Sequence, residues 1–285
     1  MRELQRKDKI LLLGFNSELT EIKLSDHIII RKGTDHELRE IYDRIKYDNL
    51  KNQQFIIEYE YTETNESTFP KKLFKLLDNL NLFFAIFLGG KTKVAYALRH
   101  IMLEGEYRQA GFTTNPKVSA HFSEEYFLKL EDSEKIKDYW KRYQLQSENQ
   151  PIQIALRRYL FSIQKSELED QVIDLMVAFE ALLIKSNEGS ISQKIATRCS
   201  KFLSGKYDHE KVYNTLREAY SLRSEIVHGS SVELNEMNSR ERHIYLGKTI
   251  ANLTELLRSC FYRKILEFTD LNSSEFIEEL KREMV

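Results

Sequence analysis

The chain has 285 residues, of which 41% are hydrophobic and 31% are charged, and its formal net charge is −1. This length and hydrophobic content can bury the core of one large domain or of two ordinary ones. The near-zero charge excludes a globally basic protein that binds nucleic acid by bulk phosphate neutralisation, although a local basic patch is still compatible with it.

The first third of the chain reads as short strands with one capped helix. Lys9–Gly14 (KILLLG) and His27–Gly33 (HIIIRKG) are leucine-rich or β-branched runs that end in glycine, which is typical of strands. Thr34, with Glu37 three residues later, forms a capping box that predicts a short helix. The aromatic and β-branched run Gln54–Tyr61 predicts another strand.

The next segment predicts helices that pack on this sheet. A helix is expected over Pro70–Leu88, where proline opens the run and two glycines follow it. A strand is expected over Lys93–Leu103, a loop over Gly105–Pro116 and a helix over Ser123–Leu145. We therefore predict a mixed α/β domain over residues 1–148, in which helices cover a sheet.

The composition changes after Pro151, because all three prolines lie at or before that position. We place the domain boundary in the polar segment Gln146–Pro151 and predict a helical bundle over residues 149–285, which makes the fold α+β. The first predicted tract is Ile152–Ile184, with a break and a capping box at Ser166 and Glu169. A second helix is capped by Ser190 and ends near Leu203, and a third runs from Asp208 to His228. A fourth runs from Asn238 or Ser239 to Phe268, and an amphipathic tail with Phe276, Ile277 and Leu280 follows.

One stretch of the predicted bundle, Tyr220–Gly229 (YSLRSEIVHG), combines a cation with a proton-transfer group. Five helical steps separate Arg223 from His228 by about 140° around the axis and about 7.5 Å along it. A long arginine side chain can fold towards the histidine, so that the two serve one site. Arginine suits a phosphate and histidine exchanges protons near neutral pH. Spacing alone favours a structural pair, in which arginine bridges helices and histidine caps a C-terminus.

The sequence around this pair resembles that of a known family. The Arg-x4-His sequence RSEIVH, within LRSEIVHG and downstream of DLMVAFEALL, resembles the Apea-like branch of the HEPN superfamily over roughly Ile152–Phe268. The resemblance implies a helical bundle that pairs as a homodimer. It also implies a metal-independent endoribonuclease of a toxin or anti-phage defence system, in which Arg223 and His228 are catalytic and RNA is the substrate.

Three residues are candidates to support this pair. Ser224 follows the arginine where many HEPN nucleases carry Asn, Asp or His, so it departs from the family pattern. Glu225 could orient His228 or repel a phosphate. Glu180 lies in a nearly apolar helix, where a buried carboxylate needs a partner. We predict that it pairs with Arg198 or Arg223, either as a structural ion pair or to position Arg223.

Three further arginines are candidates for contacts with the RNA backbone: Arg157, Arg158 and Arg198. An exposed helix face is the commoner explanation for all three. The tract Val172–Ile184 is apolar on nearly every face, so it needs cover all round, which favours a dimer.

Other features bound the remaining possibilities. Cys199 and Cys260 are the only cysteines and make no disulfide framework, which favours a reducing, cytoplasmic location. The longest apolar stretch, Leu80–Leu88, is too short for a membrane span, and no metal-ligand spacing or cofactor motif is present, so we expect neither membrane, metal nor cofactor. The N-terminal domain is predicted to sense or position a ligand, and a regulatory or inhibitory partner protein fits a toxic nuclease. The alternative is a non-catalytic HEPN-like module that binds nucleotide or protein.

Overall fold

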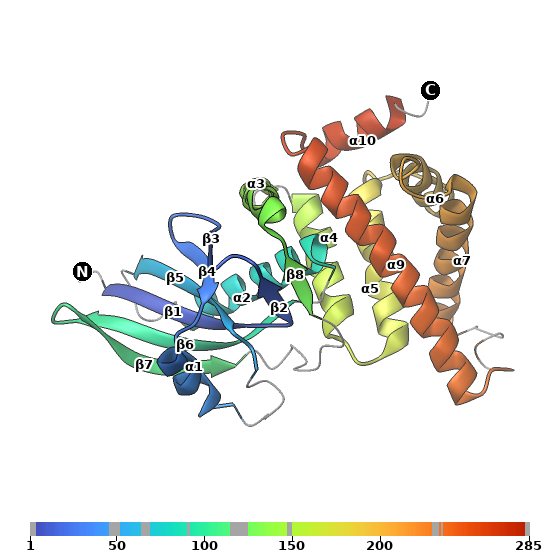
Figure 1. The fold of residues 1–285 in the computed structure, drawn as a ribbon. Helices are drawn as coiled ribbons and strands as arrows, with labels where there is room; N and C mark the ends of the chain where they lie inside the picture. Colours follow the sequence, from blue (N-terminus) through green and yellow to red (C-terminus); the bar gives the residue numbers. More distant parts are fainter. Residues whose placement is uncertain are drawn as a thin grey trace. The chain divides into compact units, whose positions relative to one another are not determined.

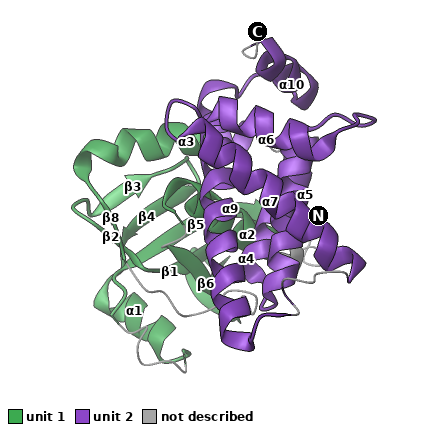
Figure 2. Cartoon of the chain, turned by 90° about the vertical axis from the view of Figure 1, so that its right-hand side faces the viewer, with its two compact units in different colours: residues 1–141 green, residues 142–285 purple. Residues whose placement is uncertain are grey.

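The structure is a computed structural model that describes residues 4–45, 52–63, 69–89, 92–114, 125–146, 150–229, 234 and 236–282. The chain forms two compact units, residues 1–141 and residues 142–285 (Figure 2). Unit 1 holds a β-sheet with helices and unit 2 is helical, which confirms the predicted α+β layout.

Unit 1 is built on a six-stranded antiparallel sheet with the order β3-β4-β5-β1-β6-β7 (Figure 1). The strands and helices of this unit are β1 Leu4–Leu13, β2 Phe15–Ser17, β3 Glu21–Lys23, β4 Ile28–Lys32, α1 Asp35–Tyr42, β5 Phe55–Glu63, α2 Phe69–Phe87, β6 Lys93–Leu103, β7 Glu106–Thr114, β8 Tyr126–Leu128 and the start of α3 Ser133–Leu145. Strand β1 lies between β5 and β6, and its two registers place Ile10 opposite Ile57 and Ala97.

The apolar ends of the central strands form the core of unit 1. Successive side chains of β1 point to opposite faces, and the last four residues of the strand are fully buried, so both faces of the sheet are covered there. Helix α1 packs Leu38 and Ile41 over Leu11 and Ile56 on one face. Helix α2 packs against β6, where the Asn81 side chain makes two 2.9 Å hydrogen bonds to the Val94 backbone.

The sequence prediction was wrong for two segments of unit 1. The predicted loop Gly105–Pro116 contains strand β7, which forms a hairpin with β6. Glu104 and Gly105 both have positive φ, as a two-residue hairpin turn requires. Strand β7 is an edge strand with mostly exposed side chains, so it lacks the apolar alternation on which the prediction depends. The predicted helix Ser123–Leu145 begins only at Ser133, because Tyr126–Leu128 pairs in parallel with β2.

Unit 2 is a bundle of helices around α5, which packs against α4, α6, α7 and α9. The helices are α4 Gln150–Gln164, α5 Leu168–Leu183, α6 Ile191–Phe202, α7 His209–His228, α9 Ser239–Glu267 and α10 Ser273–Arg282. These neighbours bury the apolar residues of α5 within a single chain. The apolar surplus of this tract therefore gives no independent support for a dimer.

Local capping signals locate most of the helix starts. Thr34 and Asn238 form complete capping boxes, and the Asp208 side chain accepts a hydrogen bond from the Lys211 N–H, as predicted. The predicted box at Ser166 is wrong, because the N-cap of α5 is Glu167 and the Ser166 hydroxyl donates to the Glu167 carboxylate instead. Ser190 is the N-cap of α6, but its side chain makes no capping hydrogen bond.

The predicted amphipathic tail is helix α10, and its three apolar residues are buried as expected. Part of the predicted boundary segment Gln146–Pro151, residues 147–149, lies outside the described residues. Across the described parts of the chain, no helix combines the length and the apolar character that crossing a membrane requires.

Candidate functional site

The Arg-x4-His motif occupies the C-terminal end of α7. Leu216, Ala219 and Leu222 are buried along one side of this helix. Helix α7 ends at His228 because Gly229 adopts a left-handed conformation (φ 66°), from which its N–H bonds the Glu225 and Ile226 carbonyls. The spacing predicted from sequence, a helical Arg223–His228 pair closed by glycine, is present in the structure.

An apolar cluster holds this end of α7 in place. Val172 of α5, Leu222 of α7, Leu246 of α9 and Leu234 are buried together, and Ile226 packs against them. Leu222 and Ile226 flank Arg223 in sequence and point into the bundle, so the backbone that carries the arginine is anchored on both sides. A side chain on such a fixed element is better positioned than one on a loop.

Both motif side chains are accessible. Arg223 is half-buried and His228 is exposed. Within the described ranges, neither side chain makes a hydrogen bond or an ion pair with another residue. The structural alternative, in which the arginine bridges helices, therefore finds no partner in the part of the bundle that the structure describes.

Ser224 and Glu225 lie between the two motif residues and are half-buried. The Ser221 hydroxyl, one turn earlier, donates a 3.3 Å hydrogen bond to Glu225 Oε1.

The predicted pairing of Glu180 with an arginine is not found. Glu180 is half-buried on α5, and no described cation lies within ion-pair distance of it. Arg198 instead donates to the Leu183 carbonyl at 2.5 Å and pairs with Glu188 at 2.7 Å. Its side chain is only 3% exposed, so this guanidinium stabilises the α5–α6 connection and is not placed to contact RNA.

The buried carboxylate of α5 is Asp174, which the sequence predicted to lie at the surface or between helices and which the structure places between α4 and α5. Its side chain is 1% exposed and lies 2.9 Å from Arg158 Nη1 and 2.8 Å from Lys165 Nζ. Arg158 thus joins α4 to α5, whereas Arg157 is exposed and pairs with no residue of the described ranges. A signal was present in the sequence, because an aspartate inside VIDLMVAFEALL needs a cation as much as the glutamate does.

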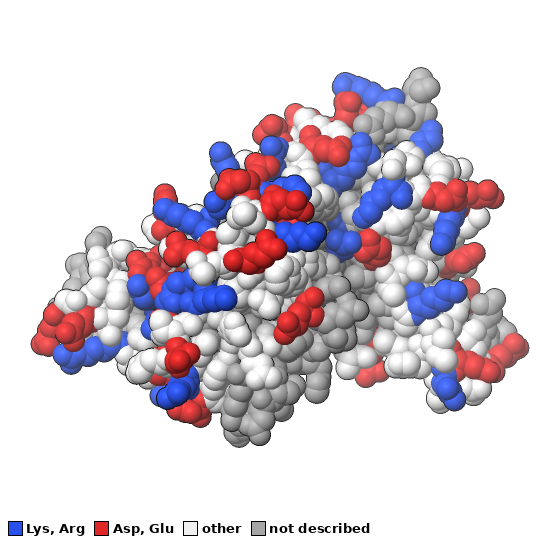
Figure 3. All heavy atoms as spheres, in the orientation of Figure 1, with Lys and Arg blue, Asp and Glu red and all other residues white. Residues whose placement is uncertain are grey.

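The surface charge matches the composition. Figure 3 shows basic and acidic side chains interspersed over the visible face. The residues that the structure describes contain no group of three or more His, Cys, Asp or Glu that could hold a metal ion. A nucleic-acid contact in unit 2 would therefore rest on a few local side chains such as Arg157 and Arg223.

Comparison of the chain with protein-family models, with curated proteins and with solved structures gives no match.

Proposed function

We propose that this protein is a metal-independent endoribonuclease of HEPN type, in which Arg223 and His228 act on RNA in the cytoplasm as part of a toxin or antiviral defence system. The observation that supports the proposal is that Arg223, unlike its neighbours in the bundle, is not engaged by another described residue. Arg158 and Arg198 are engaged by Asp174 and Glu188, whereas Arg223 lies on an anchored helix end with its guanidinium uncommitted to any described residue. A fixed cation and an accessible imidazole at the same helix end are two of the groups that phosphodiester cleavage requires.

The chemistry needs no metal because RNA carries its own nucleophile, the 2′-hydroxyl. A base removes the 2′-hydroxyl proton, the oxygen attacks phosphorus, and an acid protonates the departing 5′-oxygen. His228 supplies a proton-transfer group and Arg223 stabilises the charge that develops on the phosphate. The products are a 2′,3′-cyclic phosphate and a 5′-hydroxyl.

A single pair supplies one proton-transfer group, and the reaction needs two. A two-fold dimer would bring two copies of Arg223 and His228 into one cleft. Val227 and Ile244, which are 51% and 60% exposed on α7 and α9, are apolar surface that such a dimer would cover. Control of this activity would fall to unit 1 as a sensing domain, or to a regulatory or inhibitory partner protein.

The test is incubation of the purified chain with mixed RNA in EDTA. We expect cleavage that survives chelation and is lost in His228→Ala, because removing a positioned acid–base group lowers the rate by about 10²–10⁴-fold. His243→Ala changes an exposed histidine of α9 and is the matched control, which should cleave normally. An absence of cleavage in the wild type, together with saturable nucleotide or protein binding, would favour the non-catalytic alternative, which the near-zero net charge and Ser224 support.

A further inference from the structure

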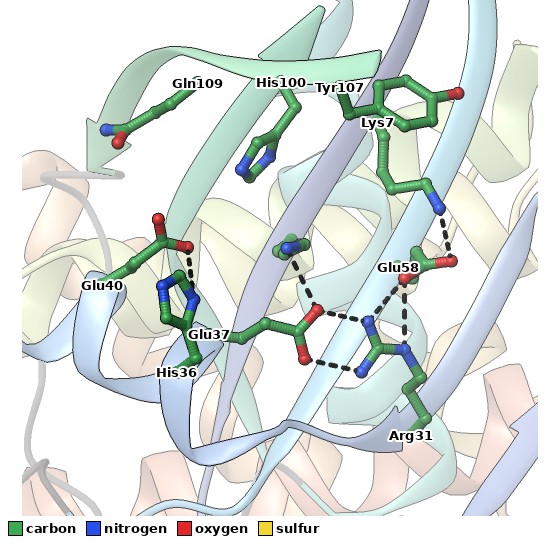
Figure 4. A pocket seen from close by; sticks show the side chains of 10 residues that line it. Lys7, Arg31, His36, Glu37, Glu40, Glu58, His100, Tyr107 and Gln109 are labelled. Carbon is green, nitrogen blue, oxygen red and sulfur yellow. Dashed lines mark hydrogen bonds and ion pairs between the residues drawn. The ribbon is translucent and has the colours of Figure 1, made fainter. Parts of the chain in front are cut away.

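The charged side chains that line a pocket around His100 in unit 1 pair with one another (Figure 4). Arg31 bridges Glu37 at 2.7 Å and Glu58 at 2.6 Å, and Lys9 lies 3.0 Å from Glu37. These cations and carboxylates neutralise one another, so the network needs no ligand to balance its charge. The two thiols of unit 2 differ from this network, because they are reactive groups without a role in the proposed nuclease.

Cys199 of α6 and Cys260 of α9 bring their side chains together in the core of unit 2. Both residues are fully buried, and their sulfurs lie 3.5 Å apart although 61 positions separate them in sequence. The sulfurs of a disulfide lie about 2.05 Å apart, so an approach of about 1.5 Å would allow a bond. Phe202 on α6 and Leu257 on α9, each one turn from its cysteine, are also buried, so packing holds the two thiols in this position.

Burial also isolates the two thiols from redox reagents. Neither cysteine has accessible surface, so a dissolved oxidant cannot reach the sulfurs of the folded chain. Thiol–disulfide exchange proceeds by attack of a thiolate, and burial raises the pKa of Cys199, which suppresses the thiolate there. The same burial would shield a bond between the two sulfurs from a reductant. The redox state of the pair is therefore set while the chain folds and is kept afterwards.

We propose that Cys199 and Cys260 form a conditional disulfide site, which is oxidised when the chain folds with glutathione disulfide and stays reduced when it folds in a reducing medium. In the unfolded chain, the thiolate of one cysteine attacks glutathione disulfide, which gives a mixed disulfide and releases one glutathione. As α6 meets α9, the second cysteine loses its proton to solvent and attacks the protein sulfur of the mixed disulfide. The second glutathione leaves and is protonated. Two protein thiols and one glutathione disulfide thus become one protein disulfide and two glutathiones.

The bond acts on the stability of unit 2. It ties α6 to α9, and in the unfolded chain it closes a loop across the 61 positions between the two cysteines. Closing such a loop restricts the unfolded chain more than the folded one, so the oxidised protein resists denaturation better than the reduced protein. The site shares no residue with the Arg223–His228 pair. The inference therefore goes beyond the proposed nuclease function and does not depend on it.

The test refolds the reduced, urea-unfolded full chain by dilution, either with an excess of glutathione disulfide over glutathione or with dithiothreitol. Alkylation under denaturing conditions, followed by measurement of the intact mass, counts the free thiols. We expect no free thiol and a mass lower by two hydrogens after refolding with glutathione disulfide, and two free thiols after refolding with dithiothreitol. The oxidised protein should have its unfolding midpoint at a higher urea concentration. Dithiothreitol added to it without urea should leave the bond intact.

The double variant Cys199→Ala, Cys260→Ala is the matched control, because these are the only cysteines of the chain. Its urea midpoint should be the same after either refolding.

Three results would each overturn the proposal. The first is two free thiols, attached glutathione or a disulfide-linked dimer after refolding with glutathione disulfide. The second is an internally bonded chain that is less folded by circular dichroism, or no more stable in urea, than the reduced chain. The third is rapid loss of the bond in dithiothreitol without urea. The thiol count needs only the wild type, so it decides the matter even if the double variant folds poorly, and none of these readouts involves RNA cleavage.

Discussion

The Asp174 carboxylate of α5 accepts a 2.9 Å hydrogen bond from Arg158 of α4. It also lies 2.8 Å from Lys165, the residue that directly follows α4. The carboxylate is buried, whereas the two cations are about two-fifths exposed. The pair thus joins α4 to α5 from the rim of the bundle. Water can stabilise the charges of the two cations, whereas the charge of the buried aspartate is stabilised only by its partners.

Removal of this carboxylate should destabilise unit 2 moderately. We expect Asp174→Ala to lower the free energy of unfolding by about 1–3 kcal/mol, since both cations can turn to water and only the hydrogen bonds and packing are lost. Asp170→Ala is the matched control, because Asp170 is exposed and contacts the same Lys165 at 3.3 Å. It should change stability by less than about 1 kcal/mol. Urea denaturation measures the free energy of unfolding of both variants. Equal losses would show that the buried Asp174 contributes no more to stability than the exposed Asp170.

The burial of Lys264 should give the free energy of unfolding an unusual dependence on pH. The residue is 1% exposed, and its ammonium donates to the Phe268 carbonyl at 2.6 Å and the Leu271 carbonyl at 3.1 Å, where α9 ends. Burial lowers the pKa of Lys264 to about 8, and Asp270 opposes this only partly. Between pH 8 and the ordinary lysine pKa, the unfolded chain binds more protons than the folded one, so stability rises with pH.

We therefore expect the free energy of unfolding to rise by about 2 kcal/mol between pH 8 and pH 10 through this residue. Above pH 10 the trend should reverse, because burial raises the pKa of Tyr143 and Tyr159 and their unfolded forms ionise first. Lys264→Met removes the lysine contribution and keeps the tyrosines. Chemical denaturation at pH 8, 9 and 10 should show the rise in the wild type only. If stability changes with pH in the same way in Lys264→Met, Lys264 is not the cause of the rise.

The two cysteines should be unreactive in the folded protein. Cys199 and Cys260 are fully buried with their sulfurs 3.5 Å apart, and burial raises the pKa of Cys199. Burial denies a reagent access to both thiols and also suppresses thiolate formation at Cys199, so labelling by a disulfide reagent should follow global unfolding. Ser204→Cys places a thiol at an exposed position and should react at once. Fast labelling of the wild type without denaturant would mean that the α6–α9 contact opens locally.

The sequence predicts elements whose signals are local. The Thr34–Glu37 and Asn238–Glu241 capping boxes lie within one helical turn, so their residues specify the helix starts without tertiary help. Strand β7 has no such local signal. Its polar side chains carry no periodic signal, and its pairing with β6 becomes visible only through the Glu104–Gly105 turn.

The candidate sites divide in the same way. Arg223, His228 and Gly229 lie on one helix end, so their relation follows from spacing alone. The partners of Arg158 and Arg198 depend on which helices meet, and the sequence analysis assigned a different acid to Arg198. The pocket around His100 is harder still to foresee. It gathers residues from β1, β4, β5, β6, β7 and α1, and a shift of one residue in any strand register would turn the contributing side chains to the other face.

The last prediction tests the role of the Arg223 guanidinium in the proposed nuclease. Arg223→Lys keeps the charge but replaces a planar two-pronged donor with a point charge, so cleavage of RNA should fall by at least about tenfold. Arg217→Lys is the matched control, because Arg217 lies on the same helix, is exposed and donates to the Ser192 hydroxyl at 3.1 Å. Its activity should equal that of the wild type.

The products separate this chemistry from a generic loss of activity. Attack by the 2′-hydroxyl leaves a 2′,3′-cyclic phosphate, and DNA of the same sequence, which lacks that hydroxyl, should remain intact. End-group analysis of the residual Arg223→Lys products should show the same cyclic phosphate, because the arginine stabilises charge and does not choose the nucleophile. Cleavage of DNA, 3′-hydroxyl products, or full activity in Arg223→Lys would each contradict the mechanism, even if the protein degrades RNA.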